Sequence, residues 1–181
     1  MPMTPTPLHA VAGSVLSTGA SLVVRPIRPD DEPMLVRFHE ELSDQSVYQR
    51  YFHMMTLAHR TAHARLARVC GVDGDRECVL VGVARDEERG APAIFGVGRL
   101  ERSGDGSVGE FAVVVADRHQ GIGVGGALLR HIVTVARQQG CARLRADMLV
   151  DNGPMRRLCG RLGIPVGPTA DPRVVEANLV L

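Results

Sequence analysis

The chain has 181 residues, of which 45% are hydrophobic and 3% are aromatic, with no Trp and a formal net charge of +1. This length supports one domain with one core, and the balanced charge with few aromatic residues argues against a nucleic-acid or anionic-membrane partner. No apolar run reaches the ~20 residues of a membrane span, and the first Arg is Arg25, so we expect a cytoplasmic protein without a secretory signal.

The first half of the chain predicts one strand and three helices after a flexible start. Residues 1–20 are rich in Pro, Thr, Ser, Gly and Ala without a clear period, so we assign them to a flexible N-terminal segment that precedes one domain over residues 21–181. Residues 21–26 predict a short strand. Three helices are then expected, one capped by Asp30 or Asp31, one over residues 44–52 and one over residues 57–69.

The second half predicts a strand-rich region followed by alternating helices and strands. Three segments rich in Val, Ile, Leu and Phe are separated by the turn-like sequences EERGAP and SGDG, and such short links predict an antiparallel meander. The meander strands are expected over residues 77–84, 93–101 and 107–115, followed by a helix to about residue 139, a strand over 144–148, a helix over 154–162 and a strand over 174–181. This order indicates a single mixed α/β (α+β) domain without internal repeats.

A glycine-rich stretch, Q-G-I-G-V-G-G over residues 120–126, stands between the last meander strand and the long helix. Each Gly in a helical position costs ~1 kcal/mol relative to Ala, so Gly125 and Gly126 indicate that something approaches the backbone closely. Free N–H groups at a helix N-terminus, together with the positive end of the helix dipole, bind anions. The stretch therefore predicts a phosphate-binding loop.

The same stretch is compatible with two other structures. Gly121, Gly123 and Gly126 satisfy G-x-G-x-x-G with Asp147 downstream, as in dinucleotide-binding folds. In that fold the glycines follow the strand almost immediately, whereas residues 116–120 intervene here and a meander precedes them, so we disfavour it. A tight strand-to-helix turn without a ligand is the second alternative. A Walker-type loop is excluded because all 21 basic residues are arginine and the chain has no lysine.

Two segments carry a resemblance to a known family. ADRHQGIGVGGALLRHIVTVARQQG resembles the acetyl-CoA signature of the GCN5-related N-acetyltransferases (GNAT), whose pattern Q/R-x-x-G-x-G/A is met by Gln120, Gly123 and Gly125. DNGPMRRLCGRLGI is similar to the second motif of that family. More narrowly, GEFAVVVAD and SDQSVYQRYF resemble the bacterial protein lysine acetyltransferases.

The resemblance implies a mostly antiparallel central sheet flanked by helices and splayed between its fourth and fifth strands. The pantetheine arm of acetyl-CoA would enter this opening and pair with backbone groups of Val113 and Val115, and the pyrophosphate would lie on the amides of residues 121–126. The residues implied to bind the cofactor are Val113, Val114, Val115, Gln120, Gly121, Ile122, Gly123, Val124, Gly125, Gly126, Asn152 and Met155.

Glu110 is the candidate general base. Acetyl transfer requires the amine to lose a proton, and a free lysine has a pKa near ~10.4. Glu110 shares a strand face with Ala112 and Val114, which places it near the opening, and partial burial would raise its pKa toward neutrality. It also matches the position of the glutamate that acts as base in the lysine acetyltransferases. The alternative is a solvated or ion-paired residue at the strand end.

Cys159 and Asn152 each have two readings. Cys159 stands where many family members have a tyrosine that protonates the departing thiolate, so it is a candidate acid, although a packed helix residue is favoured because free Cys is usually buried. Asn152 could bind the cofactor or cap the following helix. We expect no metal, because His59 and His63 lack a third ligand and the cysteines show no zinc-ligand spacing.

These features predict an acetyl-CoA-dependent N-acetyltransferase that acts on a primary amine, most simply a protein lysine, by direct transfer. Two alternatives stay open. One is acetylation of a small amine such as an aminoglycoside, a polyamine or an amino acid, and the other is a non-catalytic module that binds or senses acyl-CoA. The sequence does not select the acceptor, and the oligomeric state is also open, with a homodimer as one alternative.

Overall fold

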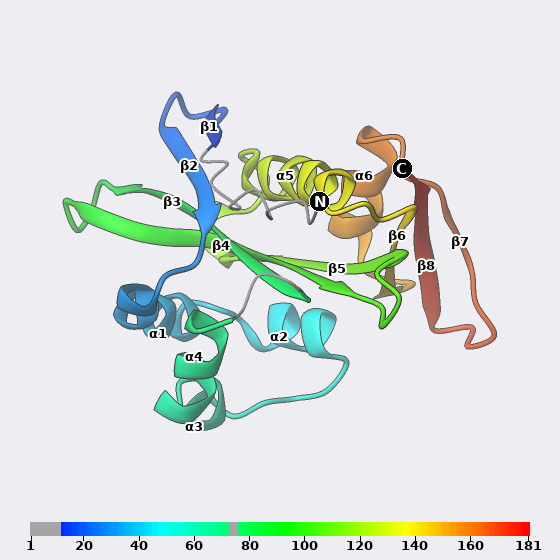
Figure 1. The fold of residues 1–181 in the computed structure, drawn as a ribbon. Helices are drawn as coiled ribbons and strands as arrows, with labels where there is room; N and C mark the ends of the chain where they lie inside the picture. Colours follow the sequence, from blue (N-terminus) through cyan, green and yellow to red (C-terminus); the bar gives the residue numbers. More distant parts are fainter. Residues whose placement is uncertain (1–11, 73–75) are drawn as a thin grey trace.

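A computed structural model describes residues 12–72 and 76–181 of the chain (Figure 1). An eight-stranded sheet with the order β1-β2-β3-β4-β5-β6-β8-β7 forms its centre. Helices α1 to α4 lie on one face of the sheet and helices α5 and α6 on the other (Figure 1). The predicted mixed α/β domain with a mostly antiparallel sheet flanked by helices is confirmed.

The bounds of the elements follow the predicted order, with additions at the edges of the sheet. The strands are β1 (Ala12–Val15), β2 (Ser21–Pro26), β3 (Glu77–Asp86), β4 (Ala91–Arg102), β5 (Val108–Val115), β6 (Arg143–Leu149), β7 (Val166–Pro168) and β8 (Val174–Val180). The α-helices are α1 (Glu32–Glu40), α2 (Asp44–Tyr51), α3 (Leu57–Arg60), α4 (His63–Cys70), α5 (Val124–Gln138) and α6 (Gly153–Arg161), and the 3-10 helices are η1 (Pro29–Asp31) and η2 (Asp117–His119).

The structure differs from the expected elements at two places in the first half of the chain. The flexible segment expected over residues 1–20 stays a prediction for residues 1–11, which lie outside the described residues. Within that segment Ala12–Val15 forms β1, because pairing with β2 stabilises a run too short to show a period. The continuous helix expected over residues 57–69 is wrong. It divides between Arg60 and His63, where Ala62 has a ψ of 126° and no Gly or Pro marks the break.

The meander and the splay of the sheet agree with expectation. β3, β4 and β5 pair antiparallel in sequence. β5 then pairs parallel with β6 from Val108, opposite Arg143, to Glu110, opposite Arg145. β5 continues to Val115 and β6 to Leu149, so the two strands separate beyond Glu110. This is the expected opening between the fourth and fifth predicted strands, which are β5 and β6.

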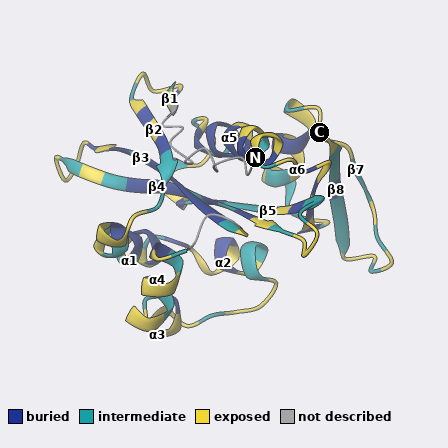
Figure 2. Cartoon of the chain, viewed as in Figure 1, coloured by how far each residue is buried: buried dark blue, intermediate teal, exposed yellow. Residues whose placement is uncertain are grey.

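Two hydrophobic clusters hold the helices against the sheet (Figure 2). The first lies under α5 and α6, and the second lies between the sheet and α1, α2 and α4. α5 packs closely on β4 because Gly96 and Gly98 face it. A Cβ atom on Gly96 would lie 2.9 Å from side-chain atoms of Leu128 and Val124. This close packing fixes the N-terminus of α5, and with it the glycine stretch, at the open end of β5. Within the described ranges, no helix is both long and apolar enough to cross a membrane.

Candidate functional site

The glycine stretch forms a turn that ends at an uncapped helix. Gly121 and Gly123 have φ values of 79° and 111°, in the left-handed region that only glycine adopts readily. Gly123 is the N-cap of α5, and no side chain in the described part of the chain caps this helix. The N–H groups of the first turn have no partner within the helix itself. The turn and the helix dipole therefore form an anion-binding geometry.

The glycines of this stretch are required for different structural reasons. A Cβ on Gly125 would lie 3.3 Å from Leu158 of α6 and 3.6 Å from Val115, so α6 and β5 themselves approach this part of the backbone. No described residue other than the chain neighbours lies within 4 Å of a Cβ built on Gly121, which needs glycine for its φ. The close approach that we had attributed to a ligand is thus partly made by the protein at Gly125.

The end of β5 turns backbone groups toward the opening. The N–H of Ala116 donates to the carbonyl of Phe95 on β4 at 3.0 Å. Because successive residues of a strand point their backbone groups to opposite edges, those of Val115 and Val113 face away from β4. The side chain of Val114 is buried in the second cluster. This arrangement suits the expected pairing of an extended ligand with Val113 and Val115, which stays a prediction.

Other residues of the candidate cofactor site have structural contacts of their own. The Nε2 group of Gln120 donates to Val115 O and to Ser46 Oγ, at 3.2 Å each, so this side chain is directed toward β5 and α2. The carbonyl of Ile122 accepts from the N–H of Ser17 at 3.0 Å, which ties the turn after β1 to the glycine stretch. Val124 is buried at the start of α5.

Asn152 and Met155 lie at the start of α6. Asn152 is the N-cap, and its Oδ1 accepts from the N–H of Met155 at 3.1 Å, so the capping interpretation is confirmed. Met155 is half-buried and packs against the first cluster. A contact of either residue with the cofactor is compatible with these positions and stays a prediction.

Glu110 lies at the last paired position of β5 and β6, where the opening begins. Its side chain is 58% exposed, and its Oε2 accepts from Nη2 of Arg145 at 3.1 Å. The expectation of partial burial is therefore wrong, because the helices on this face leave the position uncovered. Sequence reasoning also missed Arg145, since only the parallel register of β5 and β6 brings it beside Glu110.

Cys159 is fully buried in the first cluster. Burial raises the pKa of its thiol to about 11. Both observations support the packing role that we favoured over the role of acid.

Replacing Cys159 by Ala is accordingly expected to leave kcat within about twofold and its pH profile unchanged, while lowering the free energy of unfolding by about 1–2 kcal/mol through loss of buried contacts. Steady-state kinetics and urea unfolding measure the two effects. A large loss of kcat that becomes smaller as pH rises toward the thiol pKa of about 11 would instead assign the thiol a proton-donating role.

Two histidines and the two tyrosines have separate surroundings. His119 stacks on Phe95 with ring centroids 3.4 Å apart, and His63 contacts Glu32 at 2.6 Å. Tyr51 accepts a hydrogen bond from Arg65 at 3.0 Å, while Tyr48 is 44% exposed. Among the residues that the structure describes, no group of three or more His, Cys, Asp or Glu side chains could hold a metal ion.

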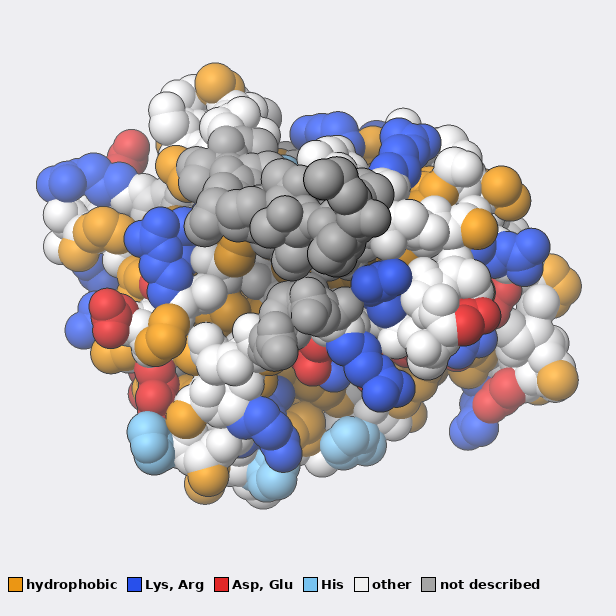
Figure 3. Space-filling view, in the orientation of Figure 1, with side chains coloured by type: hydrophobic (Ala, Val, Ile, Leu, Met, Phe, Trp, Pro, Cys, Tyr) orange, Lys and Arg blue, Asp and Glu red, His pale blue; other side chains and the backbone are white. Residues whose placement is uncertain are grey.

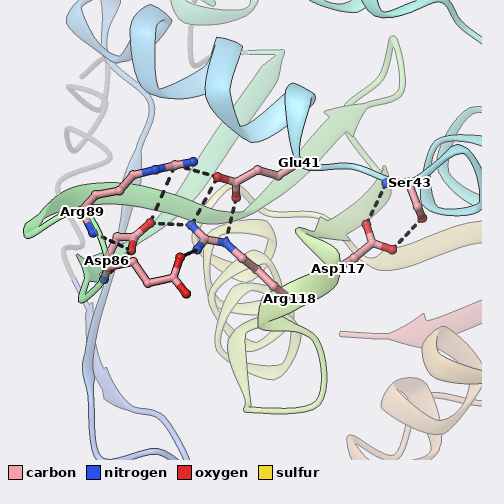
Figure 4. Close-up of polar contacts among 7 residues, drawn as sticks. Glu41, Ser43, Asp86, Arg89, Asp117 and Arg118 are labelled. Atoms are coloured by element: carbon pink, nitrogen blue, oxygen red, sulfur yellow. Dashed lines mark hydrogen bonds and ion pairs between the residues drawn. The ribbon is translucent and has the colours of Figure 1, made fainter.

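Polar contacts fix the connection between β5 and α5 from two sides (Figure 4). On one side, Arg118 pairs with Asp86 and with Glu41, whose Oε2 lies 3.1 Å from Arg118 Nε. The hydrogen bond from Arg118 lowers the pKa of Asp86. On the other side, the carboxylate of Asp117 accepts from the backbone N–H and the hydroxyl of Ser43 at 2.9 and 2.6 Å. Neither contact leaves a local signal in the sequence, because the partners lie far apart along the chain.

Comparison with known proteins agrees with this geometry. Residues 35–164 match the acetyltransferase (GNAT) family. The chain is 27% identical over 148 residues to acetyltransferase PA5475 of Pseudomonas aeruginosa, covering 82% of this chain and 77% of that protein. It is 27% identical over 161 residues to acetyltransferase Pat of Mycolicibacterium smegmatis, covering 89% of this chain but only 44% of Pat, so it spans less than half of Pat.

Solved structures show the same relationship. The GNAT domain of S. lividans PAT superposes with a TM-score of 0.83 at 32% identity, covering 97% of this chain and 99% of that domain. YncA of Salmonella typhimurium, solved with its cofactor acetyl-CoA, shares the fold with a TM-score of 0.61 at 21% identity, covering 88% of this chain and 94% of YncA. From the sequence match, the splayed sheet and the glycine turn together, we conclude that the chain belongs to the GNAT family of acetyltransferases.

Proposed function

We propose that this chain is an acetyl-CoA-dependent N-acetyltransferase that transfers an acetyl group to the side-chain amine of a protein lysine. The observation that carries the proposal is the position of Glu110, at the point where β5 and β6 separate, on the strand that leads to the uncapped N-terminus of α5. The similarity to the GNAT domain of PAT, at 32% identity over almost the whole chain, supports it.

The residues present fit a CoA thioester. We assign the pyrophosphate to the N–H groups of residues 121–126, which belong to the glycine turn and to the first turn of a helix without a side-chain cap among the described residues. We assign the pantetheine arm to the backbone of Val113 and Val115. Bound acetyl-CoA supplies the activated acetyl group, and the protein positions the amine and removes its proton.

Glu110 is proposed to accept the proton of the amine. A lysine ammonium has a pKa near ~10.4, so almost none is nucleophilic at neutral pH. The exposed carboxylate of Glu110 can take this proton directly or through a water molecule, and the ion pair with Arg145 at 3.1 Å holds it at the mouth of the opening. The free amine then attacks the thioester carbonyl, the C–S bond breaks as the amide forms, and CoA leaves as a thiolate that can take up the second proton released by the nitrogen.

The acceptor is proposed to enter from the face that carries α2. On the face shown in Figure 3, arginine side chains are interspersed with acidic and hydrophobic ones. Such a mixed surface is better suited to contact with another protein than to contact with a nucleic-acid backbone, which favours a continuous basic surface. The cytoplasmic location and a homodimer stay predictions.

Incubation with labelled acetyl-CoA, a cell lysate and a panel of small amines tests the function. We expect label on lysine residues of one or a few proteins. Because the chain has no lysine, label on lysine cannot come from the enzyme itself. Label on a small amine only would replace protein lysine with the small-amine alternative. Tight binding of acetyl-CoA without transfer to any amine would indicate a non-catalytic acyl-CoA-binding module.

A further inference from the structure

The hydroxyl of Ser46 connects the acceptor side of the domain to the cofactor side. Ser46 lies in the first turn of α2 and is 8% exposed. Its Oγ donates to Oδ1 of Asp117 at 3.0 Å and accepts from Nε2 of Gln120 at 3.2 Å. Both partners belong to the connection between β5 and α5, more than 70 residues further along the chain. One hydroxyl therefore joins α2 to the segment that leads into the glycine stretch.

Gln120 extends this contact to the edge of β5. The same Nε2 group donates to the carbonyl of Val115 at 3.2 Å. Val115 is one of the two residues whose backbone groups we assign to the pantetheine arm, and Gln120 directly precedes Gly121 of the phosphate turn. A ligand that orders Val115 and the glycine stretch must therefore also restrict the Gln120 side chain, which holds Ser46.

Asp117 fixes the same helix at its cap. Its carboxylate accepts from the N–H and the hydroxyl of Ser43, the N-cap of α2 (Figure 4). Although burial alone would raise the pKa of Asp117, the hydrogen bonds from Ser43 and Ser46 lower it. The carboxylate is thus held in the ionised form that accepts all of these bonds.

Helix α2 depends on such contacts for its position. It has eight residues, and an isolated helix of this length is marginal in water. It packs against β5 and β6 beside the opening. A change in the Ser46 contacts would therefore move or loosen the helix that an incoming amine must pass.

We infer that Ser46, Asp117 and Gln120 are positioning residues that couple acetyl-CoA binding to the order of α2. The inference rests on the proposed function for the identity of the ligand. A ligand bound to the glycine turn and to the edge of β5 restricts the side chain of Gln120. Because Gln120 and Asp117 both hold Ser46, helix α2 then becomes fixed in position for the acceptor. Such coupling requires no large movement, since one ligand can order what the next ligand needs.

Hydrogen exchange of α2, with and without acetyl-CoA, tests the inference in the full chain. In the unaltered protein, acetyl-CoA is expected to slow exchange of the amides of residues 47–51 by about tenfold. In Ser46→Ala this protection should fall below about twofold, while the Kd of acetyl-CoA stays within about threefold. With a protein acceptor, the KM of the acceptor should rise about fivefold while the KM of acetyl-CoA stays nearly constant.

Ser103→Ala is the matched control. Ser103 lies in the turn between β4 and β5. Like the hydroxyl of Ser46, its hydroxyl donates one hydrogen bond and accepts another: it donates to Asp105 at 2.6 Å and accepts from the N–H of Val108 at 3.1 Å. This variant should behave as the unaltered protein does. Ser46→Thr, which keeps the hydroxyl, should restore at least half of the protection.

Each outcome decides the inference. Equal ligand-induced protection in the unaltered protein and in Ser46→Ala overturns it, as does binding of acetyl-CoA to the unaltered protein without any protection of α2. In both of those cases the proposed function survives. Failure of the unaltered protein to bind acetyl-CoA overturns the proposed function, and the inference with it. If Ser46→Ala does not fold, Asp117→Asn takes its place, because the amide keeps the size but loses one acceptor oxygen.

Discussion

Replacement of Glu110 by Gln is expected to lower turnover by about 100-fold or more while leaving the Kd of acetyl-CoA within about twofold. The amide has the size of the carboxylate but cannot accept the proton of the amine, and a positioned general base typically contributes about 10²–10⁴-fold. Its carbonyl oxygen can still accept a hydrogen bond from Arg145, so the local geometry should survive. Steady-state release of CoA and calorimetric titration measure the two quantities.

The neighbouring strand offers a matched control. Glu101 on β4 lies opposite Glu110, is 50% exposed and pairs with Arg99 at 2.9 Å, but it is one strand further from the opening. Glu101→Gln should change turnover by less than about twofold. If Glu110→Gln retains normal turnover, Glu110 is not the base.

The pH profile gives the Glu110 variant a second signature. Without a base, the rate should depend on the fraction of acceptor that is already unprotonated. It should therefore rise about tenfold per pH unit below the lysine pKa of ~10.4, whereas the unaltered enzyme should reach its plateau at lower pH. A variant whose reduced rate does not change with pH would point to a loss of structure or of acceptor positioning.

The parts of the fold that could be predicted are those with a strong local signal. The stripe of α5 and the apolar strands of the meander were placed within about two residues, because α5 repeats its apolar residues at helical spacing and the strands are apolar runs bounded by turn sequences. β1 and β7 were missed because they are edge strands of four and three residues, too short to show a period. The break between α3 and α4 was missed because no Gly or Pro marks it.

The candidate site shows the same division between local and long-range signals. The glycine turn could be recognised from the sequence, because backbone with positive φ values and an uncapped helix N-terminus both favour glycine at these positions. The alternation of β5 placed Glu110 on the correct face, with Val114, but it could not show that this face is uncovered at that position. The contacts of Ser46 and Asp117 depend on packing between distant segments, which neither spacing nor composition reveals.

A substitution in the glycine turn is the second change for which we expect a large effect on acetyl-CoA binding. Gly126 lies in the first turn of α5, where an acidic side chain complements the helix dipole. A Cβ at this position would lie 3.3 Å from Nη1 of Arg130, the flexible end of a side chain that can move and pair with the new carboxylate. Gly126→Asp should therefore raise the free energy of unfolding by about 1–2 kcal/mol through helix propensity and charge.

The same substitution should weaken acetyl-CoA binding by about 100-fold or more, because it places a negative charge where we assign the pyrophosphate. Gly126→Asn is the matched control. It has the same size without the charge, so it should bind acetyl-CoA at least tenfold more tightly than Gly126→Asp. Urea unfolding measures the gain in stability and calorimetric titration measures the loss of affinity. Gly126→Asp is expected to show both changes together only if the anion lies at this helix end. A more stable Gly126→Asp protein with unchanged affinity would place the pyrophosphate elsewhere.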